Sequence, residues 1–270
     1  MLTLVPTPIG NIGDITLRSL DVLQEAELIL SEDTRVIKKL LNLISLKFNI
    51  HFKTHSFISL HSHNEKNFLT NQNKEILLSK NVVYVSDAGM PCISDPGACL
   101  VNFCINNNIK YDVLPGANAL LTAFAMSGFD NKEFTFFGFL PHQGRQRKVC
   151  LHNICTNPLI SILYESPHRL LKLLKEIKSI DESKEVFVAK EITKLYQQIF
   201  KGTIQKVYDQ IKVSIIKGEW VVILNNSEVQ TNNPIILEDI QDLKLPPKQK
   251  AKLISKLTGK NIKDVYNSLL

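Results

Sequence analysis

Short apolar runs rich in β-branched residues alternate with segments of helical periodicity along most of the chain. In the first part, the apolar runs predict strands at residues 2–5, 28–31, 82–86 and 111–114. Apolar residues at helical spacing predict helices between them, at residues 17–23, 34–41, 64–78 and 97–106. Strands that alternate with helices through short links form parallel sheets covered by those helices. The pattern therefore predicts an α/β domain with a parallel sheet over residues 1–115.

Pro115-Gly116 marks a turn and the boundary to a second α/β domain, over residues 116–228. The pattern there predicts strands at residues 134–137, 159–164, 186–190, 197–202 and 220–224. It predicts helices at residues 117–126, 169–180 and 204–213. The last three strands follow one another so closely that a mixed sheet is expected. A polar segment at 225–233 predicts a linker, and helical patterns at 248–257 and 262–269 predict a small extension over residues 240–270.

The net charge of +6 is concentrated in that extension. Residues 243–270 hold seven lysines and one acid, 7 − 1 = +6, and the preceding 242 residues are neutral, with 25 basic and 25 acidic side chains. A segregated basic segment indicates a polyanionic partner such as RNA. A solvated lysine face on a surface helix is an equally good interpretation of the charge alone.

Composition indicates a soluble cytoplasmic protein. Hydrophobic residues make up 44% and charged residues 21% of the chain, which is typical of globular domains. The start lacks a signal-peptide pattern, and the most apolar stretch, 117–129, is too short to cross a bilayer. Five cysteines without a C-x-x-C pair predict free thiols and no metal site.

Three loops follow predicted strands, where ligands bind in open α/β sheets. The loop at residues 6–14 lacks the spacing of dinucleotide and P-loop motifs, which disfavours a nicotinamide enzyme or an NTPase. The loop at 86–97 holds two Asp, two Gly and two Pro and predicts close approach of a ligand to the backbone. In it, Asp87 is a candidate acceptor for a ribose hydroxyl or an amino group, and Asp95 is expected to cap the next helix. The loop at 114–119 leads into a helix whose backbone N–H groups can receive a carboxylate, but by itself it is better explained as an ordinary turn between domains.

Two polar clusters are candidates for chemistry. Ser31-Glu32-Asp33-Thr34-Arg35 follows a strand and opens a helix, which Asp33 or Thr34 is expected to cap. His61-Ser62-His63-Asn64-Glu65 brings two imidazoles and a carboxylate into five residues, which is a candidate source of a general base. It lacks the spacing of a zinc-binding His pair.

Five motifs occur in an order that resembles one family. They lie at residues 4–11, 32–35, 85–96, 164–169 and 189–194. In this order they resemble the bacterial 16S ribosomal RNA cytidine 2′-O-methyltransferases, which belong to the class III (tetrapyrrole methylase-like) methyltransferases. The resemblance covers about residues 2–224, and the lysine-rich end is similar to the extension of that family. Ser62 and Met90 depart from the family pattern, where Glu and Thr are expected.

The resemblance implies two α/β domains with S-adenosyl-L-methionine in the cleft between them, a small C-terminal helical extension and a homodimer. Carried onto this sequence, it implies cofactor contacts by Pro8, Ser86, Asp87, Ala88, Gly89, Met90, Pro115, Gly116, Ala117, Tyr164 and Ala189. The implied partner is 16S ribosomal RNA or the small ribosomal subunit.

The implied reaction is 2′-O-methylation of a cytidine ribose, in which a base takes up the hydroxyl proton. Our candidates for that base are His63 first, then Glu32 or Asp33. Candidate phosphate contacts are Arg35, Arg145, Arg147, Lys148, Lys248, Lys250 and Lys252, although residues 145–148 are equally well explained as an exposed helix start. The alternatives are a small-molecule (tetrapyrrole-type) methyltransferase and a non-catalytic RNA-binding module.

Overall fold

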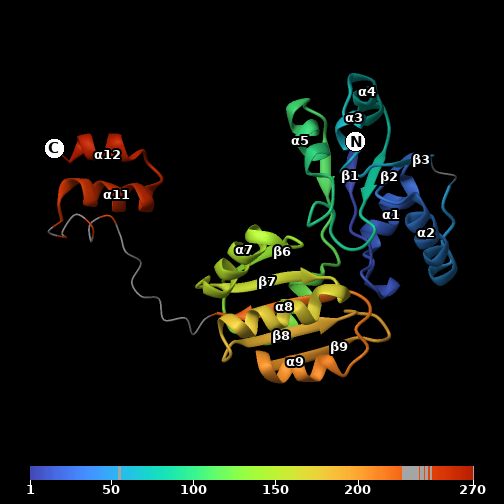
Figure 1. The fold of residues 1–270 in the computed structure, drawn as a ribbon. Coiled ribbons are helices and arrows are strands. Elements are labelled where there is room, and N and C mark those ends of the chain that lie inside the picture. The colour runs from blue at the N-terminus through green and yellow to red at the C-terminus, as the bar shows by residue number, and fades with distance from the viewer. Residues whose placement is uncertain (54–55, 227–236, 238–239, 241–242, 244, 270) are drawn as a thin grey trace. The chain divides into compact units, whose positions relative to one another are not determined.

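The computed structural model describes residues 1–53, 56–226, 237, 240, 243 and 245–269. The chain forms two compact units, Met1–Glu228 and Val229–Leu270. The first unit contains two five-stranded sheets (Figure 1). No helix in the described part of the chain is both long and apolar enough to cross a membrane.

The first sheet is wholly parallel, with the strand order β3-β2-β4-β1-β5. Its strands are β1 (Leu2–Leu4), β2 (Leu28–Ser31), β3 (Ser56–Ser59), β4 (Val82–Val85) and β5 (Tyr111–Val113). One face packs on α1 (Leu17–Glu25) and α2 (Thr34–Phe48). The other packs on α3 (Glu65–Phe68), α4 (Asn71–Ser79) and α5 (Ala98–Asn106). Because helices cover both faces, β1, β2 and β4 are buried along their whole length.

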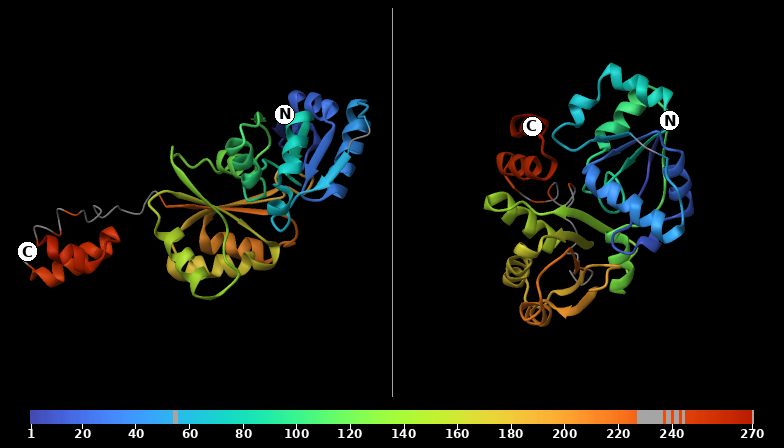
Figure 2. Two further views of the ribbon diagram at one scale, coloured as in Figure 1. Left: turned by 90° about the horizontal axis from the view of Figure 1, so that it is seen from above. Right: turned by 90° about the vertical axis from the view of Figure 1, so that its right-hand side faces the viewer.

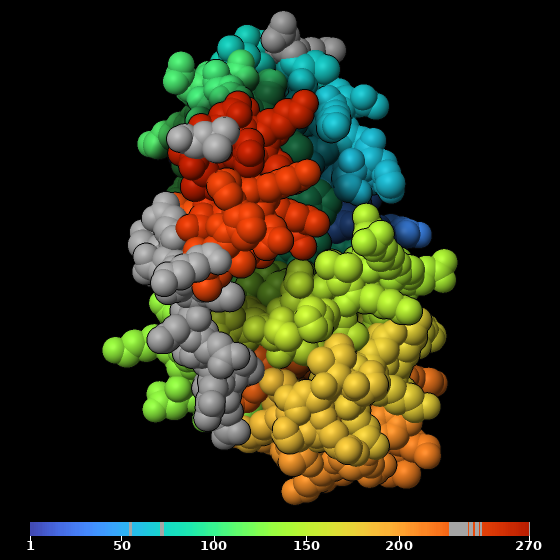
Figure 3. All heavy atoms as spheres, turned by 60° about the vertical axis from the view of Figure 1, so that its left-hand side comes forward, coloured from blue at the N-terminus to red at the C-terminus, as the bar shows by residue number. Residues whose placement is uncertain are grey.

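The second sheet is mixed, with the strand order β6-β7-β10-β8-β9, and only β6 and β7 pair in parallel. Its strands are β6 (Phe134–Phe139), β7 (Ile160–Glu165), β8 (Glu185–Lys190), β9 (Gln198–Thr203) and β10 (Trp220–Asn225). One face packs on α6 (Ala119–Ser127). The other packs on α7 (Gly144–Thr156), α8 (Pro167–Ile180) and α9 (Ile204–Lys212), visible below the sheet in Figure 2, left. In Figure 3, α8 (yellow) and α9 (orange) present their outer surfaces.

The two sheets fit the expected architecture, and three details differ from the sequence pattern. Strand β3 and helix α7 were not predicted. The single helix expected at 64–78 is two helices, α3 and α4, interrupted at residues 69–70.

The second unit contains the two predicted helices, α11 (Pro247–Thr258) and α12 (Ile262–Ser268). They enclose a small core of Ala251, Ile254 and Val265, to which Ile240 contributes. Gly259, with φ of +71°, ends α11 in the left-handed conformation that favours glycine. Residues 227–233 of the predicted linker lie outside the described residues.

Candidate active site

The loops that follow β1 and β4 are tied together by hydrogen bonds. Thr7 and Gly89 exchange both backbone bonds, each with an N···O distance of 3.0 Å. The Ser86 hydroxyl donates to the Gly89 carbonyl at 2.9 Å, and the Thr7 hydroxyl donates to the Ser86 carbonyl at 3.2 Å. Gly89 has φ of +86°, which a residue with a Cβ adopts only under strain. These bonds fix the shape of the loop that begins at Ser86.

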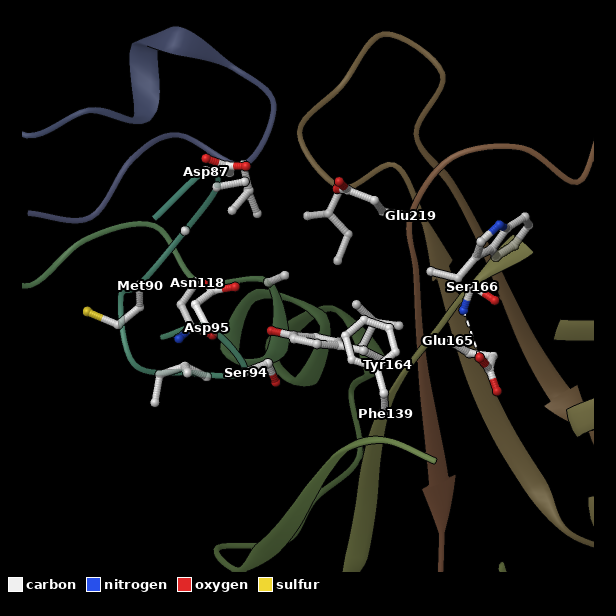
Figure 4. Close-up of a pocket in the computed structure, with 18 of the residues that line it drawn as sticks. Asp87, Met90, Ser94, Asp95, Asn118, Phe139, Tyr164, Glu165, Ser166 and Glu219 are labelled. Atoms are coloured by element: carbon white, nitrogen blue, oxygen red, sulfur yellow. Dashed lines mark hydrogen bonds between the residues drawn. The ribbon is translucent and has the colours of Figure 1, made fainter. Parts of the chain in front are cut away.

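This loop forms one wall of a cavity of about 470 Å³ within the first unit (Figure 4). The cavity lies at the carboxyl ends of β2, β4, β6 and β7, the edge where open α/β sheets bind ligands. The lining residues are Ile9, Glu32, Asp87, Ala88, Gly89, Met90, Ile93, Ser94, Asp95, Asn118, Ala119, Phe139, Tyr164, Glu165, Ser166, Pro167, Ile192, Gly218, Glu219, Trp220 and Val221.

The cavity is acidic. Five of its lining residues carry carboxyl groups: Glu32, Asp87, Asp95, Glu165 and Glu219. Among the described residues that line it, none is a lysine, an arginine or a histidine. Glu165 and Glu219 form ion pairs with Arg169 and Lys194. The other three carboxyl groups form no ion pair among the described residues, and low-dielectric walls focus their field toward a cationic ligand.

Burial and repulsion from neighbouring acids raise the pKa of three of these carboxyl groups above its ordinary value in water. Burial raises the pKa of Asp95 to about 7, and the carboxylates of Glu32 and Asp87 add to this rise. Burial and Asp87 also raise the pKa of Glu32, against the opposing effect of His61. Burial raises the pKa of Asp87, although the Asp33 N–H donates to it at 3.1 Å.

Glu165 belongs to a buried ion-pair network behind the cavity. The Glu165 carboxylate accepts a hydrogen bond from the Ser166 N–H at 2.8 Å and forms an ion pair with Arg169 at 2.7 Å. Arg147 reaches the other carboxylate oxygen of Glu165 at 3.8 Å and pairs with Glu176 at 2.7 Å. The network joins β7, α7 and α8, and so fixes the end of β7 where it meets the cavity.

A β-bulge places a second aromatic ring beside Tyr164. The pairing of β6 with β7 shifts by one residue between Phe136 and Gly138, so both Phe136 and Phe139 face Tyr164. The ring centroids of Phe136 and Phe139 lie 4.9 and 5.6 Å from that of Tyr164. Phe139 is 55% exposed and lines the cavity, so one apolar ring face there is open to a ligand.

Five of the residues predicted to bind the cofactor line this cavity: Asp87, Ala88, Gly89, Met90 and Tyr164. The other six do not: Pro8, Ser86, Pro115, Gly116, Ala117 and Ala189. Ser86 holds the loop from behind, and Ala189 is buried in the core of the second sheet. A Cβ on Gly116 would stand 2.7 Å from the Cβ of Pro6, so Gly116 allows two loops to pack closely.

Of the three candidate bases, Glu32 alone lines the cavity. His63 is exposed, and its ring lies 5.9 Å from that of His61. Asp33 caps α2, as predicted, and pairs with Arg35 at 2.6 Å. Hydrogen bonds from Arg35 lower the pKa of Asp33 to about 2, which makes it a poor proton acceptor.

The predicted phosphate contacts divide by exposure. Arg145, Lys148, Lys248 and Lys252 are exposed, Lys250 is half-buried, and the exposed Arg35 is paired with Asp33. The prediction for Arg147 is wrong, because this side chain is 2% exposed and is held between Glu165 and Glu176. A phosphate of RNA at the protein surface cannot contact Arg147 unless these ion pairs break.

The expectation that Asp95 caps a helix is also wrong. The backbone N–H groups of Gly97 and Leu100 donate to Glu65 at 3.2 and 3.0 Å, so Glu65 caps α5. Asp95 instead lines the cavity. Sequence reasoning also missed Phe139 and Glu219, both of which line it.

The chain matches the family model of Tetrapyrrole (Corrin/Porphyrin) Methylases over residues 1–208. The ribosomal RNA small subunit methyltransferase I of Campylobacter fetus subsp. fetus is 48% identical over 270 residues, 100% of both chains. The protein of that name from Thermotoga maritima is 41% identical over 231 residues, 84% of this chain and 99% of its own.

Solved structures share the fold. A cobalt precorrin-4 methyltransferase is 17% identical with a TM-score of 0.60, over 84% of this chain and 95% of its own. The uroporphyrin-III C-methyl transferase of Thermus thermophilus, in complex with S-adenosylhomocysteine, is 16% identical with a TM-score of 0.57, over 82% of this chain and 96% of its own.

The two-sheet fold, the cavity and the matched family model together define a class III methyltransferase, and the chain belongs to the tetrapyrrole (corrin/porphyrin) methylase family. Within that family it groups with the proteins named ribosomal RNA small subunit methyltransferase I. This confirms the resemblance seen in the five motifs. The cofactor predicted from that resemblance, S-adenosyl-L-methionine, is confirmed as that of the family.

Substituting Gly89→Ala tests the role of the loop that begins at Ser86. Besides the strained φ, the new Cβ would stand 3.2 Å from Ile9 Cγ2. We expect a loss of about 1–2 kcal/mol in the free energy of unfolding and weaker binding of S-adenosylmethionine in calorimetry. Gly144→Ala is the matched control, because its φ is +85° and nothing lies within 4 Å of the new Cβ. Equal cofactor affinity in the two variants would contradict this role.

Proposed function

We propose that this protein transfers a methyl group from S-adenosyl-L-methionine to the 2′-hydroxyl of a cytidine ribose in the 16S RNA of the small ribosomal subunit. The name of its full-length relatives supports the class of substrate. The observation that carries the proposal is the cavity itself, which has five carboxyl groups, no basic lining residue among those described, and an exposed aromatic ring.

The residues present fit the cofactor. S-adenosylmethionine carries a sulfonium and an ammonium group, and when bound it supplies an electrophilic methyl group. The lining carboxylates that form no ion pair among the described residues can balance that positive charge, and Asp87 is the candidate acceptor for a ribose hydroxyl or the ammonium group. Gly89 lets the ligand approach the backbone closely, because no side chain intervenes. The protein's part is to align the reacting atoms and exclude water.

The same cavity disfavours a tetrapyrrole substrate. Uroporphyrin-type rings carry several carboxylates, and a site that accepts them needs basic side chains to pair with those groups. The described lining of this cavity has acids in their place. A nucleoside brings a neutral ribose and base into the cavity and leaves its phosphates outside. The exposed face of Phe139 offers such a base a stacking surface.

A further part of the proposal is that the basic second unit holds RNA by its phosphates. Lys248, Lys252 and Lys256 are exposed and recur every four residues along α11, so they share one face of that helix. Exposed Arg145 and Lys148 on α7 are further candidate contacts in the first unit.

The triple substitution of Lys248→Gln, Lys252→Gln and Lys256→Gln tests that part. Each lost phosphate contact should flatten the slope of log K against log salt concentration by about 0.7–0.9, or roughly 2–3 in total. The measurement is binding of the cofactor-loaded protein to small-subunit RNA at several salt concentrations. The matching Lys→Arg triple variant keeps the charge and should keep the slope. An unchanged slope in the Gln variant would remove these lysines from the interface.

We also propose that the protein is a cytoplasmic homodimer. Its five cysteines are free thiols, which fits a reducing compartment, and the dimer rests on the family resemblance. Analytical ultracentrifugation at micromolar concentration should show twice the mass of the chain, and a single mass of the monomer would contradict it.

The substrate class is tested by incubating the protein with methyl-labelled S-adenosylmethionine and either small ribosomal subunits or uroporphyrinogen. We expect label in the RNA and none in the tetrapyrrole. Label in the tetrapyrrole, or none in the RNA, would overturn the proposal.

A further inference from the structure

Three of the five carboxyl groups that line the cavity have a hydrogen-bond or ion-pair partner. Asp87 accepts from the Asp33 N–H, Glu165 pairs with Arg169, and Glu219 pairs with Lys194 at 3.0 Å. In the portion of the chain that the structure describes, the side chains of Glu32 and Asp95 accept no hydrogen bond. A half-buried carboxylate without a donor is costly unless a ligand supplies one. These two groups are therefore available to the substrate.

The backbone directs Asp95 toward the cavity. Cys92 and Ser94, which flank Ile93 in the same loop, have φ of +68° and +66°, a strained conformation for residues other than glycine. Such strain clusters where a loop must hold a functional side chain. The helix that follows does not need Asp95, because Glu65 already accepts from its first N–H groups. The strained backbone of this loop therefore positions Asp95, whose side chain accepts no hydrogen bond from the described residues.

Asp95 faces the wall formed by the second sheet. Burial raises the pKa of the Tyr164 phenol to about 12, and the charge of Asp95 adds to this rise. In Figure 4 the Tyr164 side chain extends between Phe139 and the loop that carries Ser94 and Asp95. Phe139, Tyr164 and Asp95 line the same cavity, so a nucleoside that stacks its base on Phe139 can place its ribose toward Tyr164 and Asp95. Glu32 comes instead from the end of β2 and faces His61.

We propose that Asp95 is the catalytic residue that takes the proton of the ribose 2′-hydroxyl during methyl transfer. The inference rests on the proposed function. The proton passes from the hydroxyl oxygen to a carboxylate oxygen of Asp95. A bond forms between the ribose oxygen and the methyl carbon as the carbon–sulfur bond of the sulfonium breaks, and its electron pair stays on sulfur. The products are the methyl ether, neutral S-adenosylhomocysteine and protonated Asp95, which returns its proton to water.

The surroundings suit Asp95 to this step. The titratable groups that face it are Glu32, Asp87, Tyr84, Cys92 and Tyr164, and none is a cation. With burial, the two acids raise the pKa of Asp95 to about 7. A base with a pKa near the working pH is ionised in a large fraction of molecules and still binds a proton well in the transition state. A bound sulfonium lowers this pKa again, because a cation favours the carboxylate.

The test substitutes Asp95→Asn, with Glu32→Gln as the matched variant of the other free carboxyl. Single-turnover rates are measured at saturating cofactor with small subunits, across pH. Wild type should gain rate with rising pH, at or below about pH 7, as Asp95 ionises. Asp95→Asn should be slower by about 10²–10⁴-fold and should lose this rise. Glu32→Gln should keep the rise but with a midpoint at lower pH, because Glu32 helps to raise the pKa of Asp95. Calorimetry should show S-adenosylmethionine binding by both variants.

A second readout does not depend on activity. Carbon-13 NMR of the cofactor-free protein should show one carboxyl that titrates near pH 7 and is missing in Asp95→Asn. A midpoint near about 4, the ordinary value for aspartate, would contradict the inference. So would an Asp95→Asn variant with the wild-type rate and pH dependence. If wild type itself methylates no small subunits, the proposed function fails instead, and the NMR result stands separately.

Discussion

Replacing Glu165 by alanine is expected to lower the free energy of unfolding by about 3 kcal/mol, which is the cost of breaking a buried ion pair from one side. The Glu165 side chain is fully buried between Arg147 and Arg169, and Arg147 is nearly as buried. Without Glu165, both guanidinium groups lose an anion, and Arg147 is buried from water. Breaking a buried ion pair from one side costs about 3–5 kcal/mol. We expect the lower end of this range because Arg147 keeps its ion pair with Glu176 at 2.7 Å.

Chemical denaturation of Glu165→Ala and wild type measures this loss. Glu182→Ala is the control, because Glu182 pairs with Lys178 at 3.4 Å on the surface, where an ion pair contributes less than about 1 kcal/mol. If Glu165→Ala were no less stable than Glu182→Ala, the network would not hold β7 in place. Glu165→Gln, which keeps the shape, gives a second reading if the alanine variant does not fold.

Replacing Phe139 by alanine is expected to raise the KM for small subunits by about 10–100-fold, because stacking of a base on an aromatic ring is worth about 1–3 kcal/mol. The ring is more than half exposed and lines the cavity, and its core-facing contact is with Tyr164. Cofactor affinity should change little, since the loop from Ser86 to Met90 is untouched.

Phe137→Ala is the matched control for Phe139→Ala. Phe137 lies in the same strand, is 36% exposed and does not line the cavity. Steady-state kinetics at saturating cofactor should show a raised KM for Phe139→Ala alone, with partial recovery in Phe139→Trp. Equal KM values for the two alanine variants would mean that the base does not stack on Phe139.

Hydrophobic periodicity predicted most of the fold for a physical reason. Strands β1, β2 and β4 are buried on both faces, so each appears in the sequence as a continuous apolar run. Strand β3 has only Phe57 and Ile58 between two serines, and it lies at the sheet edge. Helix α7 carries the charged Arg147 on its buried face, which interrupts the apolar periodicity that predicts a helix. The sequence pattern cannot show that Glu176, 29 residues later, pairs with Arg147.

The sequence predicted the site residues that lie in one loop, but not those that are brought to the cavity by contacts between distant segments. Asp87 to Met90 stand out because glycine and proline shape their loop locally. Asp95 precedes Pro-Gly and a helix, which locally indicates a cap, but Glu65 caps that helix from 32 residues earlier. The position of Phe139 depends on a bulge in β6, and strand alternation alone puts it on the opposite face from Phe136.

We propose that the acidic cavity brings S-adenosylmethionine and the 2′-hydroxyl of a cytidine in ribosomal RNA together for methyl transfer. The most direct measurement is mass spectrometry of nucleosides from small subunits that lack the modification, after incubation with the protein and labelled cofactor. We predict that the label appears in 2′-O-methylcytidine. Label on a nucleobase, or on the ribose of a nucleoside other than cytidine, would contradict the proposed function.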